Sequence, residues 1–293
     1  MTNKPTGPRF YGRRKGRPLR TGMQALLTDM LPTLRFDATR PPAAQFGSAT
    51  GPQAELALEI GFGGGEHLAG LAEANPATNF IGAEPFVNGV ASLLRHIQTR
   101  HLSNIRIWDD DVRLILPALP VAGLSQVFIM FPDPWPKKRH AARRILQPEM
   151  MDILARLIRP GGQLVLASDD PTAKSWLLQT VMSHRQFFWT ARHPADWRDR
   201  PSHLPATRYM AKAEKASRRP HGLFLNGAGN TGGPRWKACI IGRERLYRCQ
   251  HNCRILMVGR WPTFLLRFVV TRLAQNARVF RLGPSYPYRM AGR

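Results

Sequence analysis

A stiff, proline-flanked loop carries the residues of this chain that are best suited to chemistry. The apolar run Val127–Phe131 is followed directly by Pro-Asp-Pro-Trp-Pro and then by Lys137, Lys138 and Arg139. Three prolines in five residues restrict φ and exclude a helix, so the loop presents Asp133 rigidly at the end of a strand. The pattern favours a site that grips an anionic substrate beside one catalytic or orienting carboxylate. A solvated proline-rich connector is the alternative.

A glycine turn and two acids follow the earlier apolar segments. The turn Gly61-Phe-Gly-Gly-Gly65 lets the backbone bend tightly and approach a ligand, although such turns are common to many nucleotide enzymes. Glu84 follows about 20 residues later, where an acid typically takes ribose hydroxyls. Asp111 follows the third predicted strand and could accept from an adenine amino group. Each acid alone could be a surface residue; their places at successive strand ends favour binding.

Glu59 lies inside an apolar strand, where an unpaired carboxylate is costly. We therefore expect Glu59 to have a cationic partner. A ligand that carries an ammonium and a sulfonium group would supply one.

Short apolar segments alternate with segments of helical periodicity. This alternation predicts an α/β fold, namely a doubly wound, mostly parallel, Rossmann-like sheet with helices on both faces. Ligands bind such sheets outside the carboxyl ends of the strands. We expect strands at residues 56–60, 80–83, 105–108, 126–131 and 163–167, and helices at 66–74, 87–99, 112–119, 149–158 and 172–183.

The charge is large and unevenly distributed. The 293 residues carry 43 Lys and Arg against 19 Asp and Glu, a net charge of +24. Residues 1–40 contribute 9 − 2 = +7, residues 41–225 contribute 21 − 16 = +5, and residues 226–293 contribute 13 − 1 = +12. Arginine-rich surfaces of this kind favour a nucleic-acid partner, with an anionic membrane surface as the weaker alternative.

The charge and the pattern together predict three parts of the chain. Residues 1–45 are expected to form a basic arm with a short helix, and residues 46–225 the α/β domain. Residues 226–293 are expected to form a basic, poorly ordered tail. A functional RNA-binding tail and an aberrant extension are both compatible with this composition.

The cysteines argue against a disulfide scaffold. Cys239, Cys249 and Cys253 all lie in the tail, which suits a reducing cytoplasm. Cys249, His251 and Cys253 lack a fourth ligand at a workable spacing, so we expect no metal. The amino terminus is basic without an apolar core, and no apolar run is long enough to span a bilayer. We expect a cytoplasmic protein with no membrane association and no obligate protein partner.

Four motifs together resemble the bacterial tRNA (guanine-N7-)-methyltransferases. They are Leu58-Glu-Ile-Gly-Phe-Gly63, Glu84, Phe131-Pro-Asp-Pro-Trp135 with Lys137, and Thr207-Arg-Tyr209. The FPDPW-x-K string is highly specific, and the resemblance covers about residues 9–225. It implies a class I methyltransferase fold, S-adenosylmethionine as methyl donor without a metal, and methylation of a guanine in the tRNA variable loop.

The resemblance also implies roles for individual residues. Donor-binding positions correspond to Glu59, Gly61, Gly63, Glu84, Asp111 and Asp133. Asp133 also corresponds to the catalytic position, and substrate-binding positions correspond to Lys137, Asp169, Thr207, Arg208 and Tyr209. Two features depart from the family: Met210 stands where a glutamate is expected, and residues 226–293 match nothing in it.

The implied chemistry suits these residues. Guanine N7 has an in-plane lone pair and no proton, so the site needs alignment and negative charge rather than a strong base. Tyr209 beside Arg208 could stack on a base, or it could be a packed tyrosine at a turn.

Three other functions remain as alternatives. An amino-group RNA methyltransferase usually carries Asp/Asn-Pro-Pro-aromatic, whereas here Pro-Asp-Pro-Trp differs at the second proline. A nicotinamide dehydrogenase shares the glycine turn but does not explain the basic surface. A non-catalytic RNA-binding protein that keeps the fold would account for Met210 and the tail.

Overall fold

The computed structural model describes residues 10–47, 54–218 and 220–227, with four short strands further on. The chain divides into two compact units, residues 1–233 and 234–293. In the second unit, β8 (Cys239–Ile241) pairs with β9 (Arg245–Tyr247), and β10 (Cys253–Ile255) pairs with β11 (Val270–Arg272), both antiparallel. The expectation of a poorly ordered tail falls almost entirely outside the described residues, as do Cys249 and His251.

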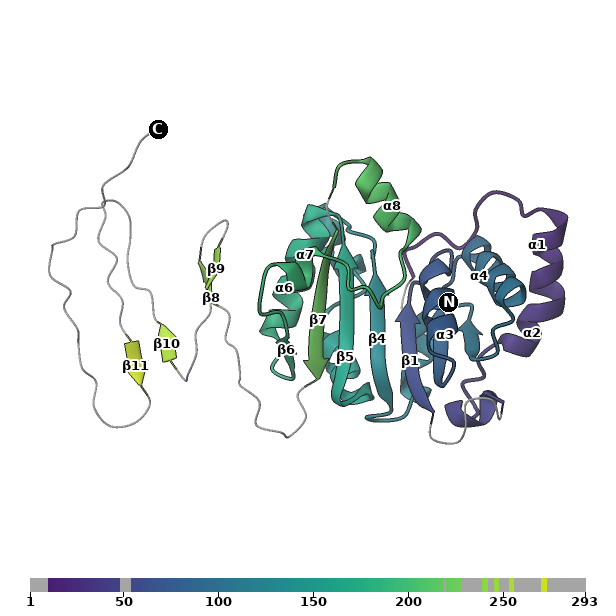
Figure 1. Ribbon diagram of the computed structural model, residues 1–293, viewed down its shortest axis with the longest axis horizontal. Helices are drawn as coiled ribbons and strands as arrows, with labels where there is room; N and C mark the ends of the chain where they lie inside the picture. The colour runs from purple at the N-terminus through teal and green to yellow at the C-terminus, as the bar shows by residue number, and fades with distance from the viewer. Residues whose placement is uncertain are drawn as a thin grey trace, which may run out of the picture. The chain divides into compact units, whose positions relative to one another are not determined.

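The first unit is built on a seven-stranded sheet with the order β3-β2-β1-β4-β5-β7-β6. Five neighbouring strands are parallel, and β7 runs antiparallel to both of its neighbours, as Figure 1 shows. The expected doubly wound, mostly parallel sheet is confirmed. The strands are β1 (Glu55–Ile60), β2 (Thr78–Ala83), β3 (Ile105–Trp108), β4 (Leu124–Met130), β5 (Ile158–Ser168), β6 (Phe187–Trp189) and β7 (His221–Gly227).

The helices connect these strands in the expected alternation. The main ones are α3 (Glu66–Ala74), α4 (Val87–Arg100), α5 (Pro148–Leu157), α6 (Pro171–Ser183) and α8 (Arg208–Lys215). Shorter elements are α1 (Thr21–Ala25), α2 (Leu31–Leu34), α7 (Ala195–Arg198), the π-helical turn η1 (Leu26–Met30), and the 3₁₀ helices η2 (Pro42–Gln45), η4 (Val112–Leu114), η5 (Leu116–Ala118) and η6 (Lys138–Arg143).

The sheet buries both of its faces. Successive side chains of a strand point to opposite faces, and in β1 Leu56, Leu58 and Ile60 pack in the core that contains α5 and α6. Ala57 packs in the other core, with apolar side chains of α3 and α4. Glu59 shares the orientation of Ala57 and therefore faces α3. Continuous hydrophobic strands are what a parallel sheet covered on both faces requires.

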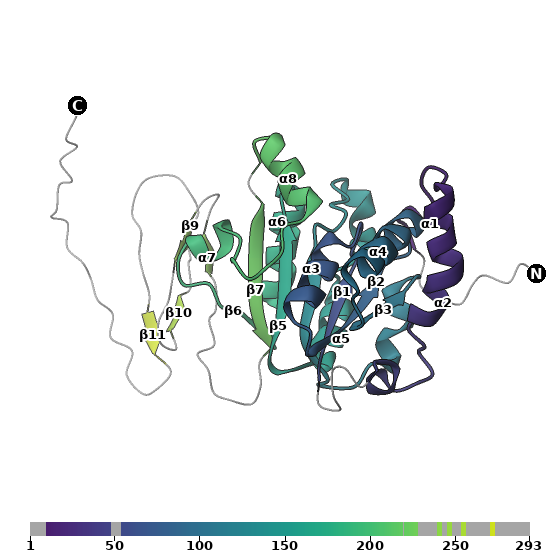
Figure 2. The ribbon, with the colours of Figure 1, turned by 45° about the vertical axis from the view of Figure 1, so that its right-hand side comes forward.

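The N-terminal segment packs against the sheet domain rather than standing apart from it. Its helices α1 and α2 lie beside α4 in both Figure 1 and Figure 2. Phe36 is buried, and its backbone N–H donates to the carbonyl of Ile107 at 2.8 Å. Among the described residues, no helix combines the length and apolar character needed to cross a membrane.

Three local expectations are wrong. The strand expected at residues 163–167 begins at Ile158, a residue that was expected to end the preceding helix. The helix expected at residues 112–119 forms the two 3₁₀ helices η4 and η5, because Pro117 cannot continue an α-helix. Phe131, expected in the fourth strand, has left the extended conformation at φ +54°. The strand ends at Met130, and the functional loop begins one residue earlier than its apolar pattern indicates.

We expect residues 1–233 to fold alone and residues 1–225 to be less stable. The cut after Leu225 removes Asn226 and Gly227, which pair with β5 and β6 inside the sheet. Circular dichroism and urea unfolding of both fragments would measure the difference. A 1–225 fragment as stable as the 1–233 fragment would show that these two residues contribute nothing to the sheet.

Candidate active site

The Pro-Asp-Pro-Trp loop combines backbone strain with an unpaired acid. Phe131 and Trp135 have φ values of +54° and +39°, a region that bulky side chains rarely adopt. The Phe131 N–H still donates to the carbonyl of Ala167 at 2.8 Å, which fixes the start of the loop to β5. Asp133 is exposed, and within the described part of the chain it makes no hydrogen bond or ion pair. Strain of this kind is concentrated at functional sites.

Aromatic contacts hold the same loop from outside. The Arg143 guanidinium lies 5.0 Å from the ring centre of Trp135 and 5.0 Å from that of Tyr11. Arg144 donates from Nη2 to the carbonyl of Trp135 at 3.2 Å. The N-terminal segment therefore reaches the loop through Arg143, a cation–π contact between elements far apart in the sequence.

Glu84 is tied to the glycine turn. Its carboxylate accepts from the N–H of Gly63 at 2.8 Å and from the N–H of Phe86 at 3.0 Å, one bond on each oxygen. Burial raises the pKa of Glu84, the two backbone donors lower it, and the nearby carboxylates of Asp133 and Glu59 raise it further. A carboxylate has about four acceptor positions, so two remain for hydroxyl donors of a ligand.

The glycine turn leaves its backbone accessible. Gly61 and Gly63 have φ values of +74° and +57°, and a Cβ on Gly61 would meet nothing within 4 Å. On the other side the turn is closely packed, because a Cβ on Gly89 of α4 would collide with the carbonyl oxygen of Gly63. The turn is therefore open to solvent at Gly61 and packed against α4 at Gly63.

Glu59 has its partner inside the chain. Its side chain is buried, and its Oε2 lies 2.9 Å from Nδ1 of His67 in α3. His67 is also buried and meets the ring of Phe128 edge-on. His67 gives the Glu59 carboxylate a buried partner within the chain. A cationic partner for Glu59, and any contact between Glu59 and a donor, stay predictions.

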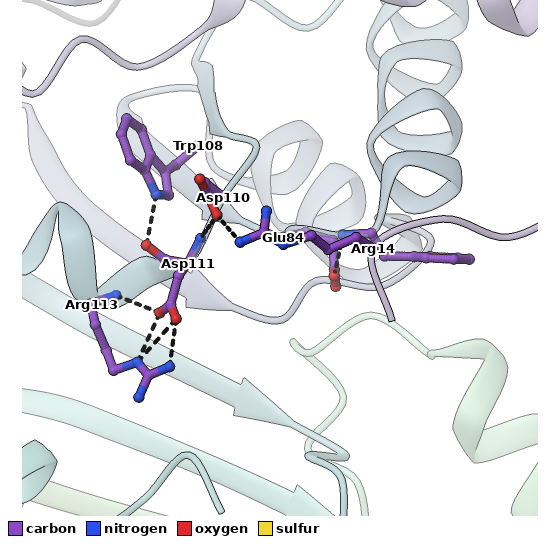
Figure 3. A network of polar contacts seen from close by, with 7 residues as sticks. Arg14, Glu84, Trp108, Asp110, Asp111 and Arg113 are labelled. Atoms are coloured by element: carbon purple, nitrogen blue, oxygen red, sulfur yellow. Dashed lines mark hydrogen bonds and ion pairs between the residues drawn. The ribbon is translucent and has the colours of Figure 1, made fainter. Parts of the chain in front are cut away.

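The acids that follow β3 point in different directions (Figure 3). Asp110 binds Nη2 of Arg14 at 2.6 Å, whereas Asp111 turns toward Arg113, 2.5 Å from its Nη2. Asp111 also caps η4 by accepting from the N–H of Arg113, and its side chain is buried. The neighbouring Asp109 accepts two hydrogen bonds from Arg35. The arginines of the N-terminal segment thus neutralise two of the three acids.

Helix α8 brings an aromatic side chain between the loop and the glycine turn. In Figures 1 and 2 the helix α8 lies over the carboxyl end of β5. The Tyr209 ring stacks on Phe131 at 5.7 Å between centres, and a Cβ on Gly63 would touch it at 3.5 Å. Burial raises the pKa of Tyr209, Arg208 opposes this, and the carboxylates of Glu84 and Asp133 add to it. Tyr209 thus lies among the site acids.

The other expected substrate residues have mixed surroundings. Thr207 is buried and caps α8 by accepting from the N–H of Met210 at 3.0 Å. Asp169 pairs with Arg218 at 2.8 Å, and the side chain of Lys137 is exposed. Met210 packs against apolar side chains of β4 and β5, so it anchors the helix. No group of three or more His, Cys, Asp or Glu side chains in the described ranges could hold a metal ion.

The structure therefore gathers Glu84, Asp133 and Tyr209 around the glycine turn, and it turns the carboxylate of Asp111 toward Arg113. Sequence reasoning missed His67 and Glu66. His67 is the second residue of the helix after the glycine turn, and a buried Glu59 signals that such a residue should be sought. Glu66 pairs with Arg208, 142 positions away, and no local pattern indicates that contact.

Comparisons with known proteins agree with this arrangement. Residues 53–222 match a family model described as "Putative methyltransferase". The tRNA (guanine-N(7)-)-methyltransferase of Rhodospirillum rubrum is 48% identical over 235 residues, which cover 77% of this chain and 90% of that protein. That of Paramagnetospirillum magneticum is 48% identical over 70% of this chain and 87% of its own.

Among solved structures, an rRNA methylase from Streptococcus thermophilus aligns over 60% of this chain and 89% of its own, with a TM-score of 0.41 and 13% identity. The identity to the two curated relatives extends over most of their length. The chain belongs to the tRNA (guanine-N(7)-)-methyltransferase family.

Proposed function

We propose that the protein transfers a methyl group from S-adenosylmethionine to N7 of a guanine in tRNA, in the variable loop. The observation that carries this proposal is Asp133, an exposed and unpaired carboxylate on a strained loop, close enough to Glu84 to raise its pKa. Membership of the family supports the reaction and the substrate class.

The residues around the glycine turn fit the donor. S-adenosylmethionine supplies an electrophilic methyl group on a positively charged sulfur. Gly61 leaves backbone open to a ligand, and Glu84 keeps acceptor positions free for ribose hydroxyls. The carboxylates near Tyr209 provide the negative field that a cationic ligand requires.

Asp133 orients the guanine and favours the charge that develops on it. The N7 lone pair forms the new bond to carbon while the carbon–sulfur bond breaks and its electrons remain on sulfur, so no proton has to leave N7. A fixed carboxylate can accept from guanine N1–H and N2–H, and it stabilises the cationic product. The Asp133 side chain has no partner to give up within the described part of the chain.

Tyr209 and Lys137 serve the RNA. Tyr209 is 41% exposed and already stacks on Phe131, so its ring is available for a flipped base. Lys137 and the basic residues Lys138 and Arg139 are exposed close to Asp133 in the sequence. Their side chains can bind phosphates without reading the RNA sequence. The amino-group alternative has no specific observation in its favour.

We expect Asp133→Asn to lower kcat for tRNA methylation by about 100- to 1000-fold, the range observed when one electrostatic group is removed from an active site. Labelled donor and mass spectrometry of tRNA nucleosides would measure the product and its position. Asp29→Asn, an exposed acid in η1, is the matched control and should keep its activity. Near-normal turnover of a folded Asp133→Asn variant would rule out the electrostatic role.

We expect Gly89→Ala to weaken donor binding about tenfold or more, because a methyl group there displaces the carbonyl of Gly63 and with it the glycine turn. Gly22→Ala is the control, since a Cβ on this helical glycine meets nothing within 4 Å. Calorimetry with S-adenosylmethionine would compare the two variants. Equal affinities would mean that the donor does not bind at this turn.

We expect tRNA affinity to fall steeply with salt. Replacing Lys137, Lys138 and Arg139 with alanine should flatten the log–log slope by about 0.7–0.9 for each phosphate that the protein no longer neutralises. Arg100→Ala is the control, because Arg100 pairs with Glu73 at the opposite end of α4 from the site. An unchanged slope in the triple variant would place the RNA elsewhere.

A further inference from the structure

The donor's amino-acid group poses a problem of charge for this site. The proposed donor carries an ammonium, a sulfonium and also a carboxylate, whereas the residues near the glycine turn include four acids, Glu59, Glu84, Asp133 and Glu66. An unpaired carboxylate brought among them would be repelled. The donor's carboxylate therefore needs its own cation or a set of N–H donors.

Arg208 supplies a cation at the turn itself. A Cβ on Gly64 would collide with Nη2 of Arg208, so the guanidinium lies directly over this glycine. Its partner is Glu66, the first residue of α3, with 3.2 Å between Nε and Oε1. A guanidinium offers forked donors that match a carboxylate. Glu66 meets this guanidinium at Nε, which lies 3.2 Å from Oε1 and 3.4 Å from Oε2.

The Arg208–Glu66 ion pair is exposed enough for Arg208 to exchange Glu66 for a ligand. The side chains of Arg208 and Glu66 are 51% and 34% exposed, so water can solvate Glu66 when it is released. Exposed ion pairs of this kind contribute little to stability. The N-terminus of α3, beside Gly64 and Gly65, also favours negative charge.

We infer that Arg208 binds the α-carboxylate of S-adenosylmethionine, which displaces Glu66 from Nε and takes the fork of the guanidinium. This inference rests on the proposed function and reassigns Arg208, which the motif suggests as a tRNA contact, to the donor. Glu66 holds the guanidinium over the turn until the donor arrives, and so acts as a positioning residue.

The surroundings favour the donor over an RNA phosphate. Glu84, Asp133 and Glu66 lie within electrostatic reach of Tyr209, next to Arg208. A polyanionic backbone would meet all three acids there, whereas a small zwitterion places its cations beside the acids and its carboxylate on Arg208. The exposed basic side chains that follow Asp133, namely Lys137, Lys138 and Arg139, are better suited than Arg208 to bind RNA phosphates.

The test compares two ligands across protein variants by calorimetry. S-adenosylmethionine and its decarboxylated analogue differ by the carboxylate alone. In Arg208→Ala, we expect S-adenosylmethionine to bind about 10- to 100-fold more weakly and the analogue to bind within about threefold of its wild-type affinity. The quantity to compare is the ratio of the two affinities, because the analogue carries more positive charge. Arg208→Lys should fall between wild type and Arg208→Ala.

Lys212→Ala is the matched control, because it removes one positive charge from the exposed side of the same helix. It should leave the ligand ratio unchanged, and urea unfolding should show that every variant is folded. If Arg208→Ala weakens both ligands equally, or weakens only tRNA binding, Arg208 does not bind the carboxylate. If the wild-type protein binds neither ligand, the proposed function itself fails.

Discussion

The gathering of carboxylates at one edge of the sheet is the constraint on which the site depends. Parallel strands end at the same edge, so the acids that follow them are brought together whatever their separation in sequence. The raised pKa of Glu84 reflects burial and two neighbouring carboxylates. Most of these acids have a partner within the protein. Backbone N–H groups donate to Glu84, His67 contacts Glu59, and arginines pair with the acids that follow β3. Asp133 is the exception among the described acids of the site, which leaves it free for a substrate.

That constraint explains the design of α8. The helix is short, and only Met210 and Ala213 are buried. The cap made by Thr207, the ion pair of Arg208 with Glu66 and that of Arg218 with Asp169 hold it at both ends. A hydrophobic side chain at position 210 strengthens the attachment to β4 and β5, where a glutamate would bring one more negative charge to an acidic edge. Met210 therefore alters how the helix is anchored without removing Tyr209 from the site.

Sequence predicted the sheet well because its signals are local. The helix Glu66–Ala74 and the strand Ile105–Trp108 have the expected bounds, since an apolar period ends there at glycine, asparagine or an acidic run. The strain at Phe131 and the 3₁₀ geometry after Asp111 depend on proline and tertiary packing, which periodicity does not report. Partners far apart in sequence, such as Arg208 with Glu66, depend on where α8 returns over the sheet. The sequence predicted that Asp133, Glu84 and the glycine turn follow strand ends. It did not predict the backbone donors of Glu84 or the arginine contacts that fix the Asp133 loop.

The N-terminal segment also changes how the net charge should be interpreted. Nine basic residues among the first 40 suggest an arm reserved for RNA, yet Arg14 and Arg35 bind Asp110 and Asp109 of the sheet domain. The Arg143 guanidinium lies over the ring of Tyr11 and over that of Trp135, which belongs to the Asp133 loop. Part of the arm's positive charge therefore offsets the acids at the sheet edge and supports the loop. The net charge of the segment therefore overstates the positive charge that it can offer to a polyanion.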